Sequence, residues 1–440
     1  MIITIVALGI YISVPFCRTK CSYCNFASDV FSKSAYEGYV VRLLEDVAAS
    51  RELVSKLGCA FESAFEEPAD SIYLGGGTPS ILDGAQLLRI FAAVRDQFAV
   101  TTDAEITVEC APGMLTPALI DTLLQCGVNR VSLGVQSFVD QEAQSVGRLH
   151  KRSTVLEEIT RLSQAGIENI SIDLIAGLPH QTAESWTFSV AETIATGVPH
   201  ASVYMLEVDD DSRLGRELIA GGARYHAHFV PDDDAAADFY QQACEMLALA
   251  GVAQYEISNF ARGEKLQSRH NLKYWTRQPY LGFGVDAHSM LERKMDGQLS
   301  PTLRFAAADS LDAYMNHVPP AVTLVSPQAA IEESFFLGLR LNRGIDLNRV
   351  RAQFRADFAR AGSSAGSPNK NCYPEGSEGP TVWDSAIRSG IEDGLLEEQG
   401  STLRLTPRGR LLSNEVFSRF LTEEKNKSGN QSRESTLVDR

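Results

Sequence analysis

Three cysteines near the start of the chain have a spacing that suits an iron–sulfur cluster. Cys17, Cys21 and Cys24 lie in the stretch YISVPFCRTKCSYCNFAS, residues 11–28. A loop of this kind can bring thiolates to three of the four irons of a cubic cluster, which leaves the fourth iron free to bind a small molecule. Zinc sites usually add a second cysteine pair, and this sequence has none. The spacing favours a cluster, but a zinc knuckle with a remote fourth ligand and metal-free thiols stay open.

Polar residues and glycines stand at the ends of several apolar runs, where a purely structural strand would not need them. They are Gly75, Gly76, Gly77 and Thr78 after the run at 71, Glu109 in EITVEC, Gln136 after RVSLGV and Asp173 in ISIDLI. A buried polar group without a partner costs about 1–3 kcal/mol. Each residue alone could be an ordinary solvated strand end. Together they predict a binding site on one face, because functional residues of parallel barrels gather at the C-terminal ends of the strands.

The elements that would position these residues form a repeating pattern. Short, β-branched apolar runs begin near residues 9, 71, 105, 130, 170, 201 and 253, and amphipathic helical stretches separate most of them. Alternation of strand and helix predicts an α/β fold with a parallel sheet. About seven such strands predict a barrel or an open fragment of one.

A second module is expected after the barrel. We divide the chain into a barrel domain at residues 1–295 and a C-terminal helical module at 296–440. Residues 329–354 read as helices around a turn, and residues 383–421 as a helix, a two-stranded wing and another helix, a winged-helix-like unit. The tract at 360–380 is rich in Gly, Ser, Pro and Asn, which predicts a flexible insertion, and the last residues are expected to be disordered.

Composition excludes some classes of protein. The 440 residues are 44% hydrophobic and 22% charged, as in an ordinary soluble globular protein, and the net charge of −16 argues against broad attraction to nucleic acid or anionic lipid. The apolar start, residues 1–16, is shorter than the roughly 20 residues of a spanning helix and suits a buried strand. The other five cysteines are scattered among apolar neighbours, so we expect no disulfide scaffold and a reducing cytoplasm.

The motifs together resemble one known family. The loop YISVPFCRTKCSYC resembles that of the radical S-adenosylmethionine (SAM) superfamily, and the likeness continues through YLGGGTPS, ITVECAPG, VSLGVQSF, IDLIAGLPHQT, HNLKYW and YLGFGVDAHS, over about residues 9–290. On these motifs the chain is identified as a member of the coproporphyrinogen dehydrogenase-like branch, which contains HemN enzymes and HemW-type haem chaperones. The resemblance implies a radical SAM partial (β/α)6-type barrel.

The resemblance also implies ligands. The three cysteines would hold a [4Fe-4S] cluster whose vacant iron is chelated by SAM, and family chemistry cleaves SAM reductively. Tyr11 and Glu109 would contact that SAM, with Gly76 at its methionine end. Positions that match a second SAM site are Gly77, Thr78, Gln136, Arg148 and Asp173; Tyr23, inside the cysteine loop, is also counted as cofactor-binding. No residue is assigned a catalytic role.

Three features separate the two family branches. HemN enzymes carry a further cysteine where this chain has Phe26, and a long N-terminal extension where only ten residues precede Tyr11. In the HemW group a histidine of the HNLKYW motif is implicated in haem binding, and the matching residue is His270, with Tyr274 and Trp275 able to stack on a porphyrin. His270 could instead be a hydrogen-bonded packing residue. His288 is a second candidate, while His226 and His228 are expected in a solvated loop.

These features favour a cytoplasmic haem chaperone that binds a [4Fe-4S] cluster, SAM and haem, and passes haem to acceptor haemoproteins, membrane respiratory enzymes being one candidate class. The chain could be a monomer or a homodimer. The alternative is an oxygen-independent coproporphyrinogen III dehydrogenase, which forms protoporphyrinogen IX by oxidative decarboxylation. A third hypothesis makes the winged unit, with Arg404, Arg408 and Arg410, a docking module for nucleic acid or protein, although no nucleic acid partner is expected.

Overall fold

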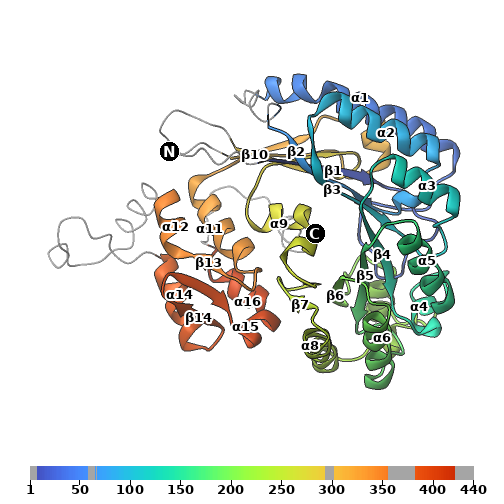
Figure 1. The fold of residues 1–440 in the computed structure, drawn as a ribbon. Helices are drawn as coiled ribbons and strands as arrows, with labels where there is room; N and C mark the ends of the chain where they lie inside the picture. The colour runs from blue at the N-terminus through green and yellow to red at the C-terminus, as the bar shows by residue number, and fades with distance from the viewer. Residues whose placement is uncertain (1–6, 58–64, 66, 293–301, 355–381, 422–440) are drawn as a thin grey trace.

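The structure is a computed structural model that describes residues 7–57, 65, 67–292, 302–354 and 382–421 (Figure 1). The predicted insertion at 360–380 and the predicted disordered tail at 423–440 lie outside the described residues.

The main sheet confirms the α/β prediction. In the described residues it has twelve strands in the order β12-β11-β10-β9-β1-β2-β3-β4-β5-β6-β8-β7. Its parallel centre consists of β1 (Leu8–Val14), β2 (Ala69–Gly76), β3 (Val100–Cys110), β4 (Arg130–Gln136), β5 (Asn169–Ala176) and β6 (His200–Met205). The connecting helices are α1 (Ser34–Lys56), α2 (Gly84–Gln97), α3 (Pro117–Gln125), α4 (Asp140–Ser145), α5 (Arg152–Gln164) and α6 (Ala183–Ala195).

Side chains alternate between the two faces along each strand, and this alternation decides which of them line the interior of the sheet. Ile10, Ile12, Ile72 and Leu74 are 0% exposed and belong to the apolar core cluster that also includes residues of α1 and α2. Successive side chains of a strand point to opposite faces, so the residues between them line the interior of the curved sheet. Those interior positions are rich in polar residues, among them Ser71, Glu109 and Asp173. The sheet therefore has an apolar helix-covered side and a polar inner side.

One predicted strand is wrong. The run at residue 253 forms only the two-residue β7 (Ala253–Gln254), which is antiparallel to β8 (Asn259–Ala261). The apolar pattern there reflects buried side-chain contacts instead of strand pairing: the Tyr255 hydroxyl lies 3.0 Å from His200 Nε2, and Glu256 is 0% exposed. The seventh parallel strand is β9 (Tyr280–Phe283), on the other side of β1.

The sheet continues past the predicted domain boundary. The antiparallel strands β10 (His288–Glu292), β11 (Thr302–Ala306) and β12 (Ala321–Val325) extend it beyond β9, and the short helix α10 (Leu311–Met315) lies between the last two. The two ends of the sheet are not paired with each other in the described residues, so the barrel is open, as predicted. The division at residue 295 stays a prediction.

The C-terminal module has an apolar core of its own. Its elements are α11 (Pro327–Gly338), β13 (Ile345–Asp346), α12 (Leu347–Gln353), α14 (Val382–Glu392), β14 (Leu396–Gln399), β15 (Thr402–Leu405), α15 (Pro407–Leu411) and α16 (Ser413–Ser418). The hairpin of β14 and β15 between helices confirms the winged-helix-like prediction. The module packs against the sheet through Glu333, which accepts from Arg277 at 2.9 Å and pairs with Arg304 at 3.1 Å.

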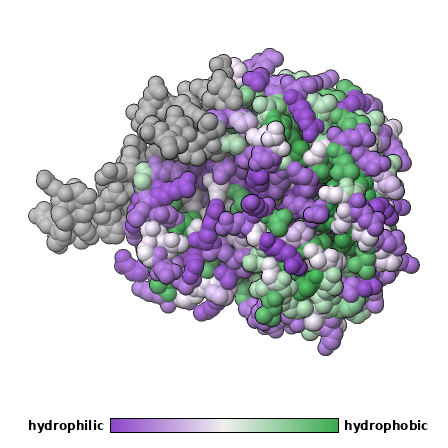
Figure 2. All heavy atoms as spheres, in the orientation of Figure 1, coloured by the Kyte–Doolittle hydropathy of each residue, from purple (hydrophilic) through white to green (hydrophobic). Residues whose placement is uncertain are grey.

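Figure 2 shows mainly hydrophilic residues over the middle of the viewed face, between the C-terminal module and the barrel. Among the described helices, none combines the length and the apolar character needed to cross a bilayer.

Candidate functional site

The cysteine loop, residues 15–29, follows β1 and is fixed by backbone contacts. Cys17 N donates to Asp29 O at 2.9 Å, and Ser22 N donates to Val146 O at 3.2 Å. The Thr19 hydroxyl donates to Gly147 O at 2.9 Å. The loop thus lies on the connection that follows β4, at the C-terminal ends of the parallel strands.

The three thiols are free, and two are electrostatically perturbed. Burial raises the pKa of Cys17 and of Cys24, and the neighbouring Cys21 raises both further. Three thiolates held this close need nearby positive charge, which bound iron supplies. No group of three or more His, Cys, Asp or Glu in the described residues surrounds a single-ion position. A cluster needs no such position, because each thiolate binds a different iron, so the donor set fits a [4Fe-4S] cluster.

The glycine-rich turn after β2 packs directly against the cysteine loop. Gly76 has φ +97°, a backbone conformation that favours glycine. A Cβ at Gly77 would lie 2.7 Å from the carbonyl oxygens of Val14 and Phe16. The Thr78 hydroxyl donates to Cys17 Sγ at 3.9 Å. The sequence predicted close approach of this turn to a ligand; the structure shows close approach to the chain segment that carries the cysteines.

Glu109 points into the barrel and is held by a tyrosine. The Tyr73 hydroxyl donates to Glu109 Oε1 at 2.7 Å, and the Tyr11 ring lies 6.1 Å from the Tyr73 ring. Burial raises the pKa of Glu109 to about 7, although the Tyr73 hydrogen bond acts in the opposite direction. A Cβ at Gly75 would lie 2.9 Å from Glu109 Cδ, so this glycine makes room for the carboxylate. The sequence analysis missed Tyr73; its position two residues before Gly75, on the same strand face, was the available signal.

Gln136 and Arg148 meet over β4. A Cβ at Gly134 would lie 3.1 Å from Gln136 Nε2 and 3.2 Å from Arg148 Nη2. Gln136 has φ +68° at a break in the strand register, and left-handed backbone at a non-glycine residue often marks a functional site. Arg148 Nη2 donates to the Tyr23 hydroxyl at 3.4 Å. The buried Nε of Arg148 has no hydrogen-bond partner among the described residues, which suits a ligand-binding group.

Asp173 lies beside this group, on β5. Its carboxylate accepts from the Ser132 hydroxyl at 3.1 Å, and its backbone pairs with Gly134. Burial raises the pKa of Asp173, while Ser202, Ser132 and Arg148 lower it. The predicted residues Tyr23, Gly76, Gly77, Thr78, Glu109, Gln136, Arg148 and Asp173 therefore lie around the strand ends and the inner face beside the cysteine loop. We call the cysteine loop and these residues the mouth. Tyr11 lies in the middle of β1, where its ring contacts those of Tyr73 and His270.

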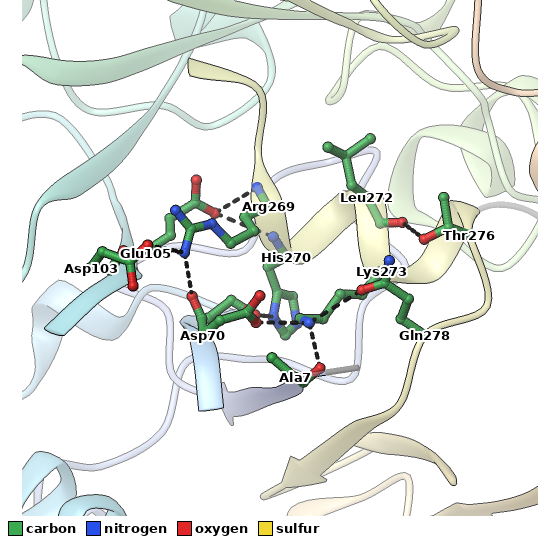
Figure 3. Close-up of polar contacts among 11 residues, drawn as sticks. Ala7, Asp70, Asp103, Glu105, Arg269, His270, Leu272, Lys273, Thr276 and Gln278 are labelled. Carbon is green, nitrogen blue, oxygen red and sulfur yellow. Dashed lines mark hydrogen bonds and ion pairs between the residues drawn. The ribbon is translucent and has the colours of Figure 1, made fainter. Parts of the chain in front are cut away.

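His270 lies at the other end of the barrel. It is carried by α9 (Arg269–Trp275), whose neighbours are the N-terminal parts of β1, β2 and β3 (Figure 3). Lys273 on the same helix pairs with Asp70 at 2.7 Å and donates to Ala7 O at 2.7 Å. The backbone nitrogens of Arg269 and His270 donate to Glu105 Oε1 at 2.8 and 3.2 Å. We call α9 and these contacts the floor.

Both ring nitrogens of His270 have partners. Nδ1 lies 3.1 Å from the Ser71 hydroxyl, and Nε2 lies 2.9 Å from the Tyr274 hydroxyl. The side chain is 1% exposed, and burial lowers the pKa of His270 to about 3, so the imidazole is neutral. Tyr11 and Tyr73 stack on it at 6.1 and 5.4 Å. An axial bond from Nε2 to haem iron would require the hydrogen bond between Nε2 and the Tyr274 hydroxyl to break.

The remaining predicted residues are engaged elsewhere. Trp275 packs under Arg340, with 4.3 Å between the guanidinium and the ring. His288 Nε2 lies 3.7 Å from the Oδ1 atom of Asp286. On the wing, Arg404 pairs with Glu397 at 2.6 Å. Arg408 and Arg410 donate to backbone carbonyls of the same unit at 3.4 and 3.3 Å. The three wing arginines are thus used in contacts within the module.

Comparison with known proteins agrees with this geometry. A family model described as the radical SAM superfamily matches residues 11–189, and one described as the HemN C-terminal domain matches residues 325–361. A protein of Lactococcus lactis named heme chaperone HemW is 30% identical over 416 residues, which cover 94% of this chain and 98% of that protein. The chain belongs to the HemW family.

A second HemW relative, from Synechocystis, is 36% identical over 338 residues, which cover 76% of this chain and 78% of that protein. Among solved structures, HemN from Escherichia coli, described as a coproporphyrinogen III oxidase and radical SAM enzyme, superposes with a TM-score of 0.73. The sequence identity is 20%, with coverage of 94% of this chain and 90% of that structure. At this identity the superposition shows a shared fold, while HemW membership comes from the sequence relatives.

Proposed function

We propose that this protein is a haem chaperone that holds a [4Fe-4S] cluster and SAM at the mouth of its barrel, binds haem, and transfers haem to acceptor haemoproteins. The observation that carries the proposal is the packing of the three-cysteine loop against the glycine turn in a chain that matches HemW relatives over almost their whole length. The match to HemN supports only the fold. Phe26 stands at the position where the resemblance to HemN enzymes implies a further cysteine.

The mouth residues have distinct roles in this proposal. Cys17, Cys21 and Cys24 hold the cluster, which when bound supplies the open iron that SAM chelates and the electron for its cleavage. Glu109, kept in place by Tyr73, and Tyr11 face the bound SAM, and the turn at Gly76 presents its backbone.

A second group, formed by Gln136, Arg148 and Asp173, provides a positive and a negative side chain a short distance further around the inner face, with Gly77 and Thr78 beside it. Tyr23 positions the Arg148 guanidinium through its hydroxyl. We propose that this group binds a second polar cofactor or the polar edge of the first.

The cellular setting is also a proposal. Free thiols at Cys17, Cys21 and Cys24 are compatible with a reducing cytoplasm. The identity of the acceptor haemoprotein and the choice between monomer and homodimer are open to direct measurement by haem transfer and by light scattering of the reconstituted protein.

One experiment separates the chaperone from the enzyme. The full chain is reconstituted with iron and sulfide without oxygen, and then tested in parallel for haem retention, for haem transfer to an apo-haemoprotein, and for turnover of coproporphyrinogen III with SAM and a reductant. We expect haem retention and transfer without protoporphyrinogen IX formation. Porphyrinogen turnover without haem retention would contradict the proposal.

A further inference from the structure

Lys20 lies inside the cysteine loop, and its ammonium group joins the first half of the loop to the second. Its Nζ atom donates to Phe26 O at 2.9 Å and to Ser28 O at 2.6 Å. Lys20 stands between the first and the second cysteine, whereas both acceptors follow the third cysteine. The side chain therefore spans the region that carries the thiols, and two of the three donors of its ammonium group are used within the loop.

The backbone of Lys20 is held by segments outside the loop. Its carbonyl oxygen accepts from Arg213 Nη1 at 3.2 Å, and Arg213 begins α7 (Arg213–Ala220). The preceding residue, Thr19, donates to Gly147 O at 2.9 Å. The protein itself makes all these contacts, so they can keep the loop in this shape before a cluster binds. A site whose supporting contacts are already in place loses less entropy on binding.

The two residues that Lys20 holds each lie next to a cysteine of the loop. Burial raises the pKa of Cys24, and a hydrogen bond from the backbone of Phe26 acts in the opposite direction. Burial also raises the pKa of Cys17, and the neighbouring side chain of Ser28 acts in the opposite direction. A donor beside a sulfur atom stabilises the thiolate form. Lys20 therefore fixes one donor beside each of these two cysteines.

The hydroxyl of Ser28 is not fully used within the protein. Ser28 is 5% exposed, and its Oγ atom has no partner within ordinary hydrogen-bond distance among the described residues. A buried hydroxyl without a partner is costly, and such a group is commonly completed by a ligand or by water. A thiolate accepts hydrogen bonds more strongly than a thiol, and bound iron keeps a cysteine in the thiolate form. The sulfur of iron-bound Cys17 is thus a suitable acceptor for this hydroxyl.

A cation inside this loop has a specific electrostatic effect on a bound cluster. Three thiolates outweigh the positive charge of a [4Fe-4S] core, so the bound unit is negative, and one added electron makes it more negative. Positive charge and hydrogen bonds to the sulfurs stabilise the reduced state more than the oxidised state. The reduction potential of the cluster should therefore depend on Lys20, although Lys20 is not one of the iron ligands.

We propose that Lys20 is a positioning residue for the cluster. Its ammonium group holds Phe26 and Ser28 so that their donors face the sulfurs of two cluster ligands. The bound cluster is then easier to reduce and is lost more slowly. This inference rests on the proposed cluster site and adds to it a residue that binds no iron.

The test uses the full chain reconstituted with iron and sulfide without oxygen, and it measures two properties of the cluster. One is the midpoint potential, followed by electron paramagnetic resonance during titration with dithionite, and the other is the rate at which an added chelator removes iron. Lys20→Met keeps the length of the side chain but removes its charge and donors. We expect its midpoint potential to fall by about 59 mV, which is a tenfold change in the ratio of reduced to oxidised cluster. Iron loss should be about tenfold faster.

Three further variants separate positioning from a general effect of charge. Lys20→Arg keeps a cation with several donors and should recover much of both properties. Arg18→Met removes an exposed cation from the same loop and should change neither, because water and salt screen an exposed charge. Lys20→Met combined with Ser28→Ala should lower the potential by less than the sum of the two single changes, because Lys20 acts in part through Ser28. Thermal unfolding of each variant checks that the chain is folded.

The outcomes are distinct. A lower potential and faster iron loss in Lys20→Met, recovered in Lys20→Arg and absent in Arg18→Met, support the inference. A folded Lys20→Met chain that takes up no iron, while Lys20→Arg does, supports it as well. Wild-type values in Lys20→Met, an equal shift in Arg18→Met, or full additivity with Ser28→Ala overturns the inference and leaves the proposed cluster intact. Failure of the wild-type chain to take up iron and sulfide contradicts the proposed function itself.

Discussion

The two ends of the barrel use polar residues in opposite ways. At the floor, Lys273 and His270 are both 1% exposed, and all their side-chain nitrogens have hydrogen-bond or ion-pair partners. Figure 3 draws those of Lys273. At the mouth, Arg148 Nε has no hydrogen-bond partner among the described residues, Gln136 has left-handed backbone, and two cysteine thiols have raised pKa values.

This difference separates stability from function. A fully paired buried charge stabilises the fold only while its partners stay, and it offers nothing to a ligand. Strained backbone and incompletely paired groups lower stability and are retained where a ligand completes them. The paired contacts of the floor therefore stabilise the fold, and the mouth is where we propose that the cofactors bind.

The largest expected effect is at the mouth. Cys17→Ala, Cys21→Ala or Cys24→Ala removes a cluster ligand, so each variant should lose the broad absorbance near roughly 400 nm and most of the about four irons per chain after anaerobic reconstitution. Cys244→Ala, on α8 (Asp233–Leu249), is the matched control because that thiol is half-buried away from the loop. Full iron content in the variant that lacks all three cysteines would falsify the ligand assignment.

The next effect is at the floor. Lys273→Ala leaves Asp70 and Ala7 O without their charged donor, so we expect the free energy of unfolding of the cluster-free protein to fall by about 3 kcal/mol, measured by urea denaturation. Lys265→Ala, an exposed lysine, should change it by less than about 0.5 kcal/mol. Iron content per folded chain should stay unchanged. If Lys273→Ala kept its stability but lost the cluster, the floor would serve cluster binding and not stability, contrary to the comparison.

A pH series sharpens the assignment of His270. Its pKa is lowered in the fold from 6.5 to about 3, so the unfolded chain binds the proton more readily and stability falls as the pH drops below about 6.5. Between pH 7 and pH 5 the wild-type chain should lose about 2 kcal/mol more than His270→Gln, whose amide does not titrate. Equal acid sensitivity of the two proteins would show that the imidazole is not buried in neutral form.

The smallest effect concerns Glu109. Its contribution to stability changes with pH in the direction opposite to that of His270. Its pKa is raised from 4.5 to about 7, so the folded chain holds the proton more tightly and stability falls as the pH rises through this window. From pH 6 to pH 8 the cofactor-free wild type should lose about 1.3 kcal/mol relative to Glu109→Gln. The measurement is thermal unfolding across pH; parallel curves for the two proteins would contradict a buried, proton-binding carboxyl.

Sequence patterns predicted the parallel core because the alternation of apolar residues in β1 to β6 matches burial against the helices. The same reasoning failed at Tyr255 and Glu256, which are buried by side-chain contacts with His200 on β6 and with Arg340 of the C-terminal module. A short apolar run in a sequence does not distinguish a paired strand from a segment that is buried by side-chain contacts.

Local motifs located the mouth, because the cysteines, the glycine turn and the strand-end polar residues each lie next to their own strand. The partners of His270 and of His226 lie far away along the chain, at Ser71 and at His180. Such pairs depend on how distant segments pack, and no local spacing encodes them. Sequence motifs therefore could not predict that His270 lies at the floor and that His226 contacts His180.

The most direct test of the central claim is the electron paramagnetic resonance spectrum of the reduced, reconstituted protein before and after addition of SAM. If three thiolates leave one iron open at the mouth, SAM must change the signal of a [4Fe-4S] cluster in the wild type and in His270→Gln alike. A signal that SAM does not alter, or a sample that contains zinc in place of iron and sulfide, would contradict the account.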